Sequence, residues 1–161
     1  MAKVISHNKL PKNSILLNGW EKCDYLDCFS VQLPKPETVD SALTRFFGKA
    51  NGGVVYVSDE NNHVKKYRLG KITEDLSGIY YPIGSRAVLF NVINRTKSEI
   101  VLGEEHKHLD FRTTILVEHN GNETIMFSST AVRYNKPIGK LYFFFVKPFH
   151  SLLIKLFLKW M

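Results

Sequence analysis

The closing stretch of the chain, LYFFFVKPFHSLLIKLFLKWM, is its most apolar part and is dotted with lysines. A helix that spans a membrane needs roughly 20 predominantly apolar residues. The longest unbroken apolar run here is Leu141–Val146, which is six residues long and is followed by Lys147 and Pro148. The stretch therefore does not predict a spanning helix, and its apolar surface has to be covered in another way.

Projected at about 100° per residue, the end of this stretch predicts a helix with a wide apolar arc. One broad side carries Phe149, Leu152, Leu153, Leu156, Phe157 and Trp160. A narrow stripe opposite carries Ser151, Lys155 and Lys159. Such a wide arc is typical of a helix that is covered on most of its surface. His150 falls within the arc, where a neutral imidazole needs a hydrogen-bond partner.

Two interpretations of this helix remain open. Either it folds back as a lid over the domain, or it is an amphipathic helix that lies on a membrane surface. The run Leu141–Val146 extends beyond what a surface helix needs, which favours the lid, whereas the lysine stripe favours the membrane surface. Asn135 is expected to cap a helix that begins at Pro137, and Pro148 is expected to kink it.

The rest of the chain predicts mainly strands. Asp24–Pro34 alternates loosely and ends at proline, and a short helix is expected between the cap residue Thr38 and the stop residue Gly48. Residues 54–69 fit either a hairpin or a helix. Four β-branched or aromatic runs fill residues 87–135, and the Asn-Gly pair in HNGNE predicts a hairpin turn. The pattern predicts an α+β fold in which an antiparallel meander is covered by the C-terminal helix.

Composition and charge narrow the classes of protein. With 44% apolar and 23% charged residues, residues 1–161 are expected to form one globular domain, in which residues 1–20 are a flexible segment without a signal-peptide pattern. Cys23 and Cys28 are too few for a disulfide framework, which indicates a reduced, cytoplasmic protein. The net charge is +7, and residues 124–161 contain six Lys or Arg and no Asp or Glu. Such an end favours weak contact with an anionic membrane surface.

Several other partners are not expected. The aromatic residues cluster on the predicted helix instead of alternating with basic residues on a strand, so nucleic acid is not an expected partner. The chain has no phosphate-binding loop, no dinucleotide glycine fingerprint and no Gly-x-Ser-x-Gly elbow, and no cofactor is expected. Whether the protein is a monomer or a dimer stays open.

Three stretches of the chain resemble a known family. They are DYLDCFSVQLP, EIVLGEEHKHLDFRTTI and NKPIGKLYFFFVKPFH, which carry the patterns D-Y-x-D-x-F, G-x-x-x-x-H-L-D-F-R and G-x-x-Y…PFH. In this order they resemble the bacterial domain-of-unknown-function family 2867, over residues 24–161. The chain departs from the family pattern between Phe47 and Gly70, where the usual Trp and Arg-Asn pair are missing.

The resemblance also implies a fold. The family is similar to the helix-grip superfamily (SRPBCC), which includes START lipid-transfer domains, birch-pollen-allergen-like proteins and polyketide cyclases. Such a fold is a curved antiparallel sheet wrapped around a long C-terminal helix, with one or two short helices after the first strand and a cavity between sheet and helix. This agrees with the lid interpretation.

The segment HKHLDFR is the most polar one on a predicted strand. Alternation would place His106, His108, Asp110 and Arg112 on one face, and Leu109 and Phe111 on the other. Facing a cavity, Arg112 would clamp an acid, and His108 with Asp110 would move a proton. The alternative is a solvent-facing ion pair between Asp110 and Arg112. The two histidines lack a third ligand, so no metal site is expected.

The expected ligand-binding residues come from this strand and from the closing helix. They are His108, Asp110, Arg112, Tyr142, Phe145, Phe149 and His150. Asp24 and Asp27 are interpreted instead as turn or edge charges. The leading hypothesis is a protein that binds or carries a hydrophobic or amphipathic small molecule between sheet and helix. The alternatives are a cyclase- or hydratase-like enzyme that uses His and Asp in the same cavity, and a peripheral membrane protein that uses the basic helix.

Overall fold

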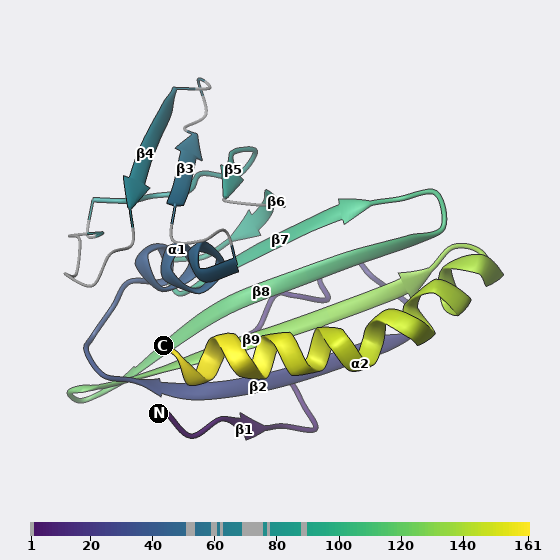
Figure 1. Cartoon of the computed structure of the whole chain (residues 1–161), viewed down its shortest axis with the longest axis horizontal. Coiled ribbons are helices and arrows are strands. Elements are labelled where there is room, and N and C mark those ends of the chain that lie inside the picture. Colours follow the sequence, from purple (N-terminus) through teal and green to yellow (C-terminus); the bar gives the residue numbers. More distant parts are fainter. Residues whose placement is uncertain are drawn as a thin grey trace.

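The computed structural model describes residues 2–50, 54–58, 61, 63–68, 76, 78–87 and 90–161. Within them the chain forms one antiparallel sheet and two helices (Figure 1). The elements are β1 (Ile5–Ser6), β2 (Tyr25–Leu33), α1 (Val39–Ala50), β3 (Val54–Ser58), β4 (Val64–Arg68), β5 (Arg86–Ala87), β6 (Phe90–Arg95), β7 (Glu99–Glu105), β8 (Leu109–Asn120), β9 (Glu123–Tyr134) and α2 (Pro137–Lys159). The strand order in the sheet is β1-β2-β9-β8-β7-β6-β5-β3-β4. The prediction of an α+β fold with a curved antiparallel sheet and a long C-terminal helix is confirmed.

The meander from β6 to β9 is the longest continuous part of the sheet. Each strand pairs with the next in antiparallel fashion, as the β-branched runs predicted. Asn120 pairs with Glu123, so the tight turn between β8 and β9 consists of Gly121 and Asn122. Gly121 has a φ of 64°, a conformation that costs glycine little. The predicted hairpin is confirmed, with its turn one residue later than the Asn-Gly pair suggested.

Helix α1 is held on the same face of the sheet as α2. The backbone N–H of Ser41 donates to Thr38 Oγ1 over 3.1 Å, which confirms the predicted cap. Arg95 of β6 forms a buried ion pair with Asp40 at 2.8 Å and so ties α1 to the sheet. The helix runs through Gly48 to Ala50, so the prediction that Gly48 ends it is wrong. One glycine costs a helix only about 1 kcal/mol, which packing outweighs.

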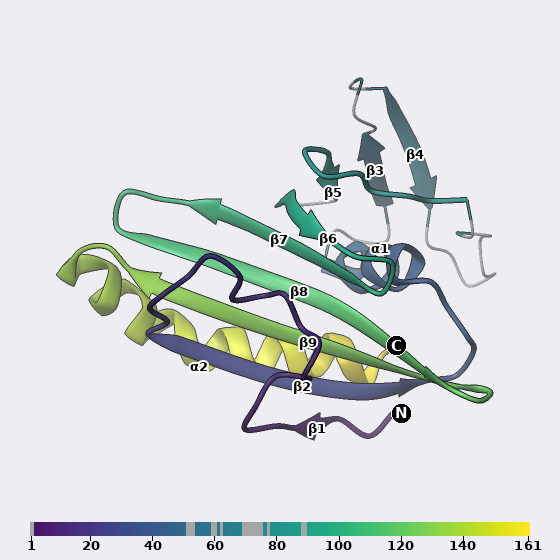
Figure 2. The ribbon, with the colours of Figure 1, turned by 180° about the vertical axis from the view of Figure 1, so that it is seen from behind.

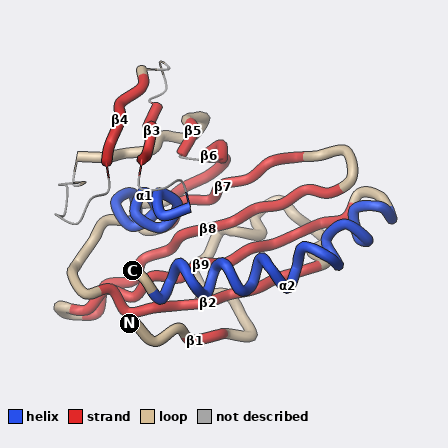
Figure 3. The backbone as a smooth tube through the Cα atoms, in the orientation of Figure 1, coloured by secondary structure: helices blue, strands red, loops and turns tan. Residues whose placement is uncertain are grey.

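The ambiguous residues 54–69 form a hairpin where the structure describes them. β3 pairs with β4 from Val54–Arg68 to Ser58–Val64. β3 also pairs with β5, so the hairpin extends the far end of the sheet, away from α2 (Figure 3). Leu69, which also belonged to the ambiguous stretch, lies outside the described residues.

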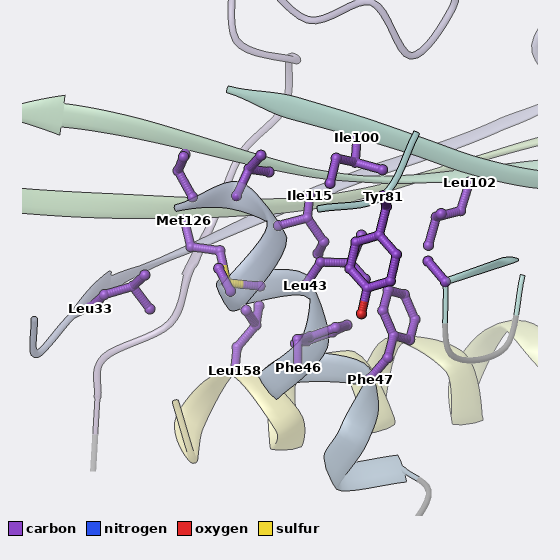
Figure 4. Close-up of a cluster of buried hydrophobic side chains, with 14 of the residues drawn as sticks. Leu33, Leu43, Phe46, Phe47, Tyr81, Ile100, Leu102, Ile115, Met126 and Leu158 are labelled. Atoms are coloured by element: carbon purple, nitrogen blue, oxygen red, sulfur yellow. The ribbon is translucent and has the colours of Figure 1, made fainter. Parts of the chain in front are cut away.

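Helix α2 runs along the sheet over β2 and β9 (Figure 1) and packs on it through a narrow stripe. The buried residues of the stripe are Gly139, Phe143, Ile154 and Leu158. Figure 4 shows Leu158 close to Met126 of β9 and to Phe46 of α1 in the main core. At Gly139 a Cβ atom would clash with the carbonyl oxygen of His108, so only glycine lets the helix approach the sheet here.

Two expectations about α2 come from the sequence, a cap at Asn135 and a kink at Pro148. Lys136 occupies the N-cap position without a capping side-chain hydrogen bond. Asn135 instead donates through Nδ2 to His106 O and to Asp110 Oδ1, each over 3.0 Å, so the expected cap is wrong. Pro148 lies inside α2, which continues from Pro137 to Lys159, although proline offers no N–H to the carbonyl of Phe144. The kink at Pro148 stays a prediction.

The prediction that most of the surface of α2 is covered is wrong. Large apolar side chains on its far side are exposed, from 45% for Leu156 to 71% for Phe144. The reason is geometric, because a helix on an open sheet buries only the stripe that faces the sheet. Among the described residues, no other layer lies over α2 (Figure 1).

The opposite face of the sheet is covered by the N-terminal segment (Figure 2). Leu16 is fully buried there against Val101 and Ala131. The buried carboxylate of Glu99 accepts hydrogen bonds from Ser14 Oγ (2.7 Å), the N–H of Ile15 (2.8 Å) and Thr114 Oγ1 (2.8 Å). The segment expected to be flexible is thus fastened to the sheet by its own hydrogen bonds. Cys23 and Cys28 are both free thiols.

Candidate ligand-binding pocket

A cavity of about 750 Å³ lies between the sheet, α1 and α2. Its size is within the range of small-molecule sites, which is roughly 300–1,000 Å³. The wall consists mainly of apolar and aromatic side chains, which are Phe46, Phe47, Phe90, Leu109, Phe111, Val132, Ile138, Tyr142, Phe143, Val146, Leu153, Ile154 and Phe157. The remaining wall residues are His106, His108, Thr113, Thr130 and His150.

Helix α2 is anchored near both ends by aromatic contacts, and the cavity lies between it and a floor that includes Phe111, Val132 and two threonines. Toward the N-terminal end, the ring of Phe143 lies 4.8 Å from that of Tyr25 and 6.2 Å from that of Tyr134, centroid to centroid. Toward the other end, Phe157 packs edge-on against Phe46 at 6.0 Å. Between these anchors the floor presents the two threonines of neighbouring strands, which fill little space. The helix therefore bridges a space that its own side chains do not fill.

One polar cluster faces this apolar cavity, and His150 is at its centre. Nε2 of His150 lies 3.3 Å from Asp27 Oδ2 and 3.2 Å from Thr130 Oγ1. The Tyr25 hydroxyl donates to Asp27 Oδ2 over 2.8 Å, and the Thr130 N–H donates to Asp27 Oδ1 over 2.8 Å. Asp27 is thus held by two donors from the sheet while it faces the imidazole. The expectation that His150 needs a hydrogen-bond partner within the apolar arc of α2 is thus confirmed.

The cluster places its hydrogen-bonding groups in fixed roles. The pKa of Tyr25 is raised to about 12, mainly because the phenol is buried. A hydrogen bond with Ser151 lowers the pKa, and the nearby charge of Asp27 contributes to raising it. The phenol therefore stays neutral at physiological pH and donates to the carboxylate. Of this cluster, the residues that line the wall of the cavity are His150 and Thr130.

Asp27 is a functional candidate that sequence reasoning missed, and its interpretation as an edge charge is wrong. Its carboxylate is buried under α2, with 8% of the side chain exposed. Tyr25 and Asp27 are two residues apart on β2, so both side chains point to the same face. The signal was present in the sequence, since D-Y-x-D-x-F and PFH are two of the three matching stretches, and the structure brings them together.

Among the expected residues on HKHLDFR, the structure places only the histidines at the cavity. β8 begins at Leu109. His106 and His108 lie in the turn before it, which is closed by a hydrogen bond of 3.0 Å from the His106 N–H to the Leu109 carbonyl. Within β8 the predicted alternation is confirmed, and the side with Leu109 and Phe111 faces the cavity, whereas the side with Asp110 and Arg112 does not. The turn places His106 and His108 on the cavity side as well. The expectation that all four polar residues share one cavity-facing side is therefore wrong.

Asp110 and Arg112 act on the opposite face of the sheet. Asp110 pairs with Arg133 at 2.8 Å and not with Arg112. Burial would raise the pKa of Asp110, but hydrogen bonds from Arg133 and Asn135 outweigh it and leave the pKa below its ordinary value. Arg112 donates to the carbonyl oxygens of Leu16 (3.1 Å) and Asn18 (2.6 Å). Arg112 therefore holds the N-terminal segment, whereas Asp110 is tied to Arg133 and Asn135.

The four expected residues on α2 divide in the same way. Tyr142 and His150 line the cavity. Phe145 and Phe149 are 65% and 69% exposed on the far side of the helix and are not part of the wall. In the described part of the chain, no three His, Cys, Asp or Glu side chains converge as metal ligands. His106 instead lies 3.3 Å from Glu104 in a pair at the surface.

The fold and the pocket define an α+β protein with a curved antiparallel sheet, a C-terminal helix and a cavity between them. The family model described as "Protein of unknown function (DUF2867)" matches residues 64–156, which is more than half of the chain. The chain belongs to this family. The matched region includes the turn with His106 and His108 and most of α2, whereas Tyr25 and Asp27 precede it. No curated protein and no solved structure matches the chain at a significant level.

Proposed function

We propose that this protein binds and carries an amphipathic small molecule in the pocket between the sheet and α2. The observation that supports the proposal is a cavity of about 750 Å³ with a mainly apolar and aromatic wall. Such a wall favours a guest because contact removes apolar surface from water, at about 25 cal/mol per Å² before the costs of association. A guest of this kind has a ring or chain of carbon atoms as its larger part.

The polar end of the guest would contact His150 and Thr130. Both groups line the cavity, and Asp27 together with the Tyr25 hydroxyl fixes the imidazole from behind. A few fixed polar groups in an apolar site orient a ligand and select it by its hydrogen-bonding end. We therefore expect molecules with one hydroxyl, carbonyl or carboxyl group to bind more tightly than hydrocarbons of the same size.

The same features support a helix-grip assignment for the fold. The sheet is antiparallel and curved, one short helix follows the first long strand, and the C-terminal helix crosses the sheet over a cavity (Figure 1). Cavities of this type serve carriers and enzymes alike, so the assignment by itself selects no activity.

A second candidate function is acid–base catalysis in the same pocket. It is favoured by one observation, which is the 3.3 Å contact between His150 and Asp27 beside the cavity. A carboxylate behind an imidazole fixes its tautomer and stabilises its protonated form. The pair that this activity would use is His150 with Asp27, since Asp110 lies on the other side of the sheet.

The decisive experiment is to fill the pocket without disturbing the fold. Leu153 lines the cavity and is half-exposed, so Leu153→Trp should fill the opening and weaken the binding of a fluorescent fatty-acid analogue about tenfold or more. Leu152→Trp is the matched control, because Leu152 is the neighbouring residue on α2 but is absent from the wall. Native mass spectrometry of the purified protein should reveal a co-purified apolar guest.

Two results would contradict the carrier proposal. One is saturable binding that the two tryptophan variants lose to the same extent. The other is a purified protein that carries no guest and binds neither the fatty-acid analogue nor other apolar probes.

A further inference from the structure

The far side of α2 is an apolar surface without a partner in the described part of the chain. We define the outer face as Leu141, Phe144, Phe145, Phe149, Leu152 and Leu156, each of which is at least 45% exposed. These residues recur along the helix and form a continuous band opposite the buried stripe. Monomeric soluble proteins rarely expose apolar patches of more than a few hundred Å², and larger ones mark interaction surfaces.

A row of lysines runs along one flank of this outer face. Lys147 Nζ lies 5.3 Å from the ring centre of Tyr25, and Lys155 Nζ lies 5.3 Å from that of Phe29, so both lie on the side of α2 above β2. Lys140 is one heptad before Lys147 and falls on the same flank. Residues 124–161 contain no Asp or Glu to balance them.

This combination of chemistry fits an anionic lipid surface better than a protein partner. Interfacial helices bury an apolar face at the boundary between headgroups and acyl chains and place lysines against anionic headgroups. The core of a protein interface is depleted of charged residues. A second copy of this chain, packed with its α2 antiparallel to the first, would bring the two lysine rows toward each other, which like charges oppose.

The helix is expected to lie on the bilayer and not to cross it. By length and composition alone, α2 is long and apolar enough to span a membrane. A span would place Lys147 and Lys155 within the hydrocarbon, where each central lysine costs about 2.5–3.5 kcal/mol or more. It would also pull Phe143, Ile154 and His150 away from their contacts with the sheet.

We propose that the outer face of α2 docks on an anionic membrane surface, with the helix axis parallel to the bilayer. The phenylalanines enter the headgroup boundary and the lysines of the β2 flank contact lipid phosphates. Tyr142 and Leu153 line the pocket and are also exposed on α2, so a docked protein opens its pocket toward the lipid. This last consequence rests on the proposed function, whereas docking itself does not.

The test is sedimentation of the purified protein with vesicles of defined composition. The full chain should pellet with vesicles that contain phosphatidylglycerol, bind vesicles of phosphatidylcholine alone about tenfold more weakly, and be released by high salt. The double variant Phe144→Ser/Phe149→Ser should lose about tenfold or more in vesicle affinity. It should keep its affinity for the fatty-acid analogue, because neither residue lines the pocket.

Two controls separate this surface from general stickiness and general charge. Val64→Ser/Ile83→Ser replaces two exposed apolar residues away from α2 and should leave vesicle binding unchanged. Lys147→Gln/Lys155→Gln should lose about tenfold in affinity for the anionic vesicles. Lys12→Gln/Lys97→Gln removes the same charge from exposed positions elsewhere and should lose much less.

Three outcomes would overturn the proposal. The first is that the full chain pellets with neither kind of vesicle. The second is that light scattering finds a dimer that Phe144→Ser/Phe149→Ser dissociates, while vesicles capture neither form, which would make the outer face a contact between copies. The third is that the protein stays in the membrane after alkaline carbonate extraction, which would indicate a spanning helix. A pocket that fails to bind the fatty-acid analogue would contradict the proposed function and leave docking intact.

Discussion

The polar side chains on the two faces of the sheet lie in different surroundings. On the face toward the N-terminal segment, Glu99 and Arg112 bind groups of the chain itself, and the space is filled. On the face toward α2, His150 and Thr130 border a cavity of about 750 Å³. Glu99 and Arg112 bond to the N-terminal segment and so contribute to stability. His150 and Thr130 also have partners in the chain, but they line the cavity in which the proposed guest would lie. These four side chains come from β7, β8, β9 and α2, so neighbouring strands carry both structural residues and candidate binding residues.

The largest expected effect lies on the filled face. Glu99→Ala would leave the Ser14 hydroxyl, the Ile15 N–H and the Thr114 hydroxyl without their acceptor in a buried place. The free energy of unfolding should fall by about 3 kcal/mol or more, measured by urea denaturation. Glu118→Ala, at an exposed position of β8, should change it by less than about 0.5 kcal/mol. Equal losses in the two variants would remove the structural role assigned to Glu99.

An intermediate effect is expected at the cavity and should appear in binding. His150→Phe keeps an aromatic ring in the wall but removes the hydrogen bonds with Asp27 and Thr130. The affinity for a fatty acid should fall about tenfold, while that for a hydrocarbon of similar size should hold or rise, as measured by displacement of a fluorescent probe.

Arg112→Leu is the mirror variant for this experiment. It should lower the free energy of unfolding by about 1–2 kcal/mol, because the carbonyls of Leu16 and Asn18 lose a charged donor, and leave the affinity unaltered. If Arg112→Leu weakened fatty-acid binding and His150→Phe did not, the division between the two faces would be reversed.

The smallest expected effect is a pH dependence that belongs to the filled face. The folded-state pKa of Asp110 is below its ordinary value, so its contribution to stability is full above the unfolded pKa and is lost as pH falls through the folded pKa. Acid titration of the unfolding free energy should therefore be shallower in Asp110→Asn than in the wild type, by less than about 1 kcal/mol over this range. Probe affinity over the same range should be alike in the two proteins. Identical titration curves would show that Arg133 does not hold this carboxylate.

Local patterns in the sequence predicted most of the sheet and failed where long-range geometry decides. Alternation and turn residues predicted β2 and the strands from β6 to β9, because each depends on neighbours along the chain. Alternation correctly placed Asp110 and Arg112 opposite Leu109 and Phe111, but the sequence does not show which of these faces borders the cavity. The turn at residues 106–108 puts the two histidines beside Leu109 and Phe111, which alternation alone did not predict. The pairing of Asp27 with His150 depends on β2 lying next to β9 under α2, which only the topology reveals.

The closing helix illustrates a different limit of sequence reasoning. It is apolar almost all the way round, so its pattern cannot identify which side meets the sheet. Gly139 is the informative residue, since its lack of a side chain permits the closest approach, but a single glycine looks like a weak point in a helix until its neighbour is known. The apolar pattern of α2 predicted a mostly buried helix and therefore did not reveal that its far side is exposed.

Pro148 gives α2 a built-in place to bend. It lies between Phe143 and Ile154, two buried residues that hold the helix on the sheet on either side of His150. Because proline has no N–H, the helix lacks one backbone hydrogen bond at this position. We expect bending at Pro148 to lift the middle of the helix while the contacts of Phe143 and Ile154 with the sheet are kept. The proposed guest would then enter without separation of the whole helix from the sheet, so loading would cost the free energy of bending one helix and not that of unfolding it.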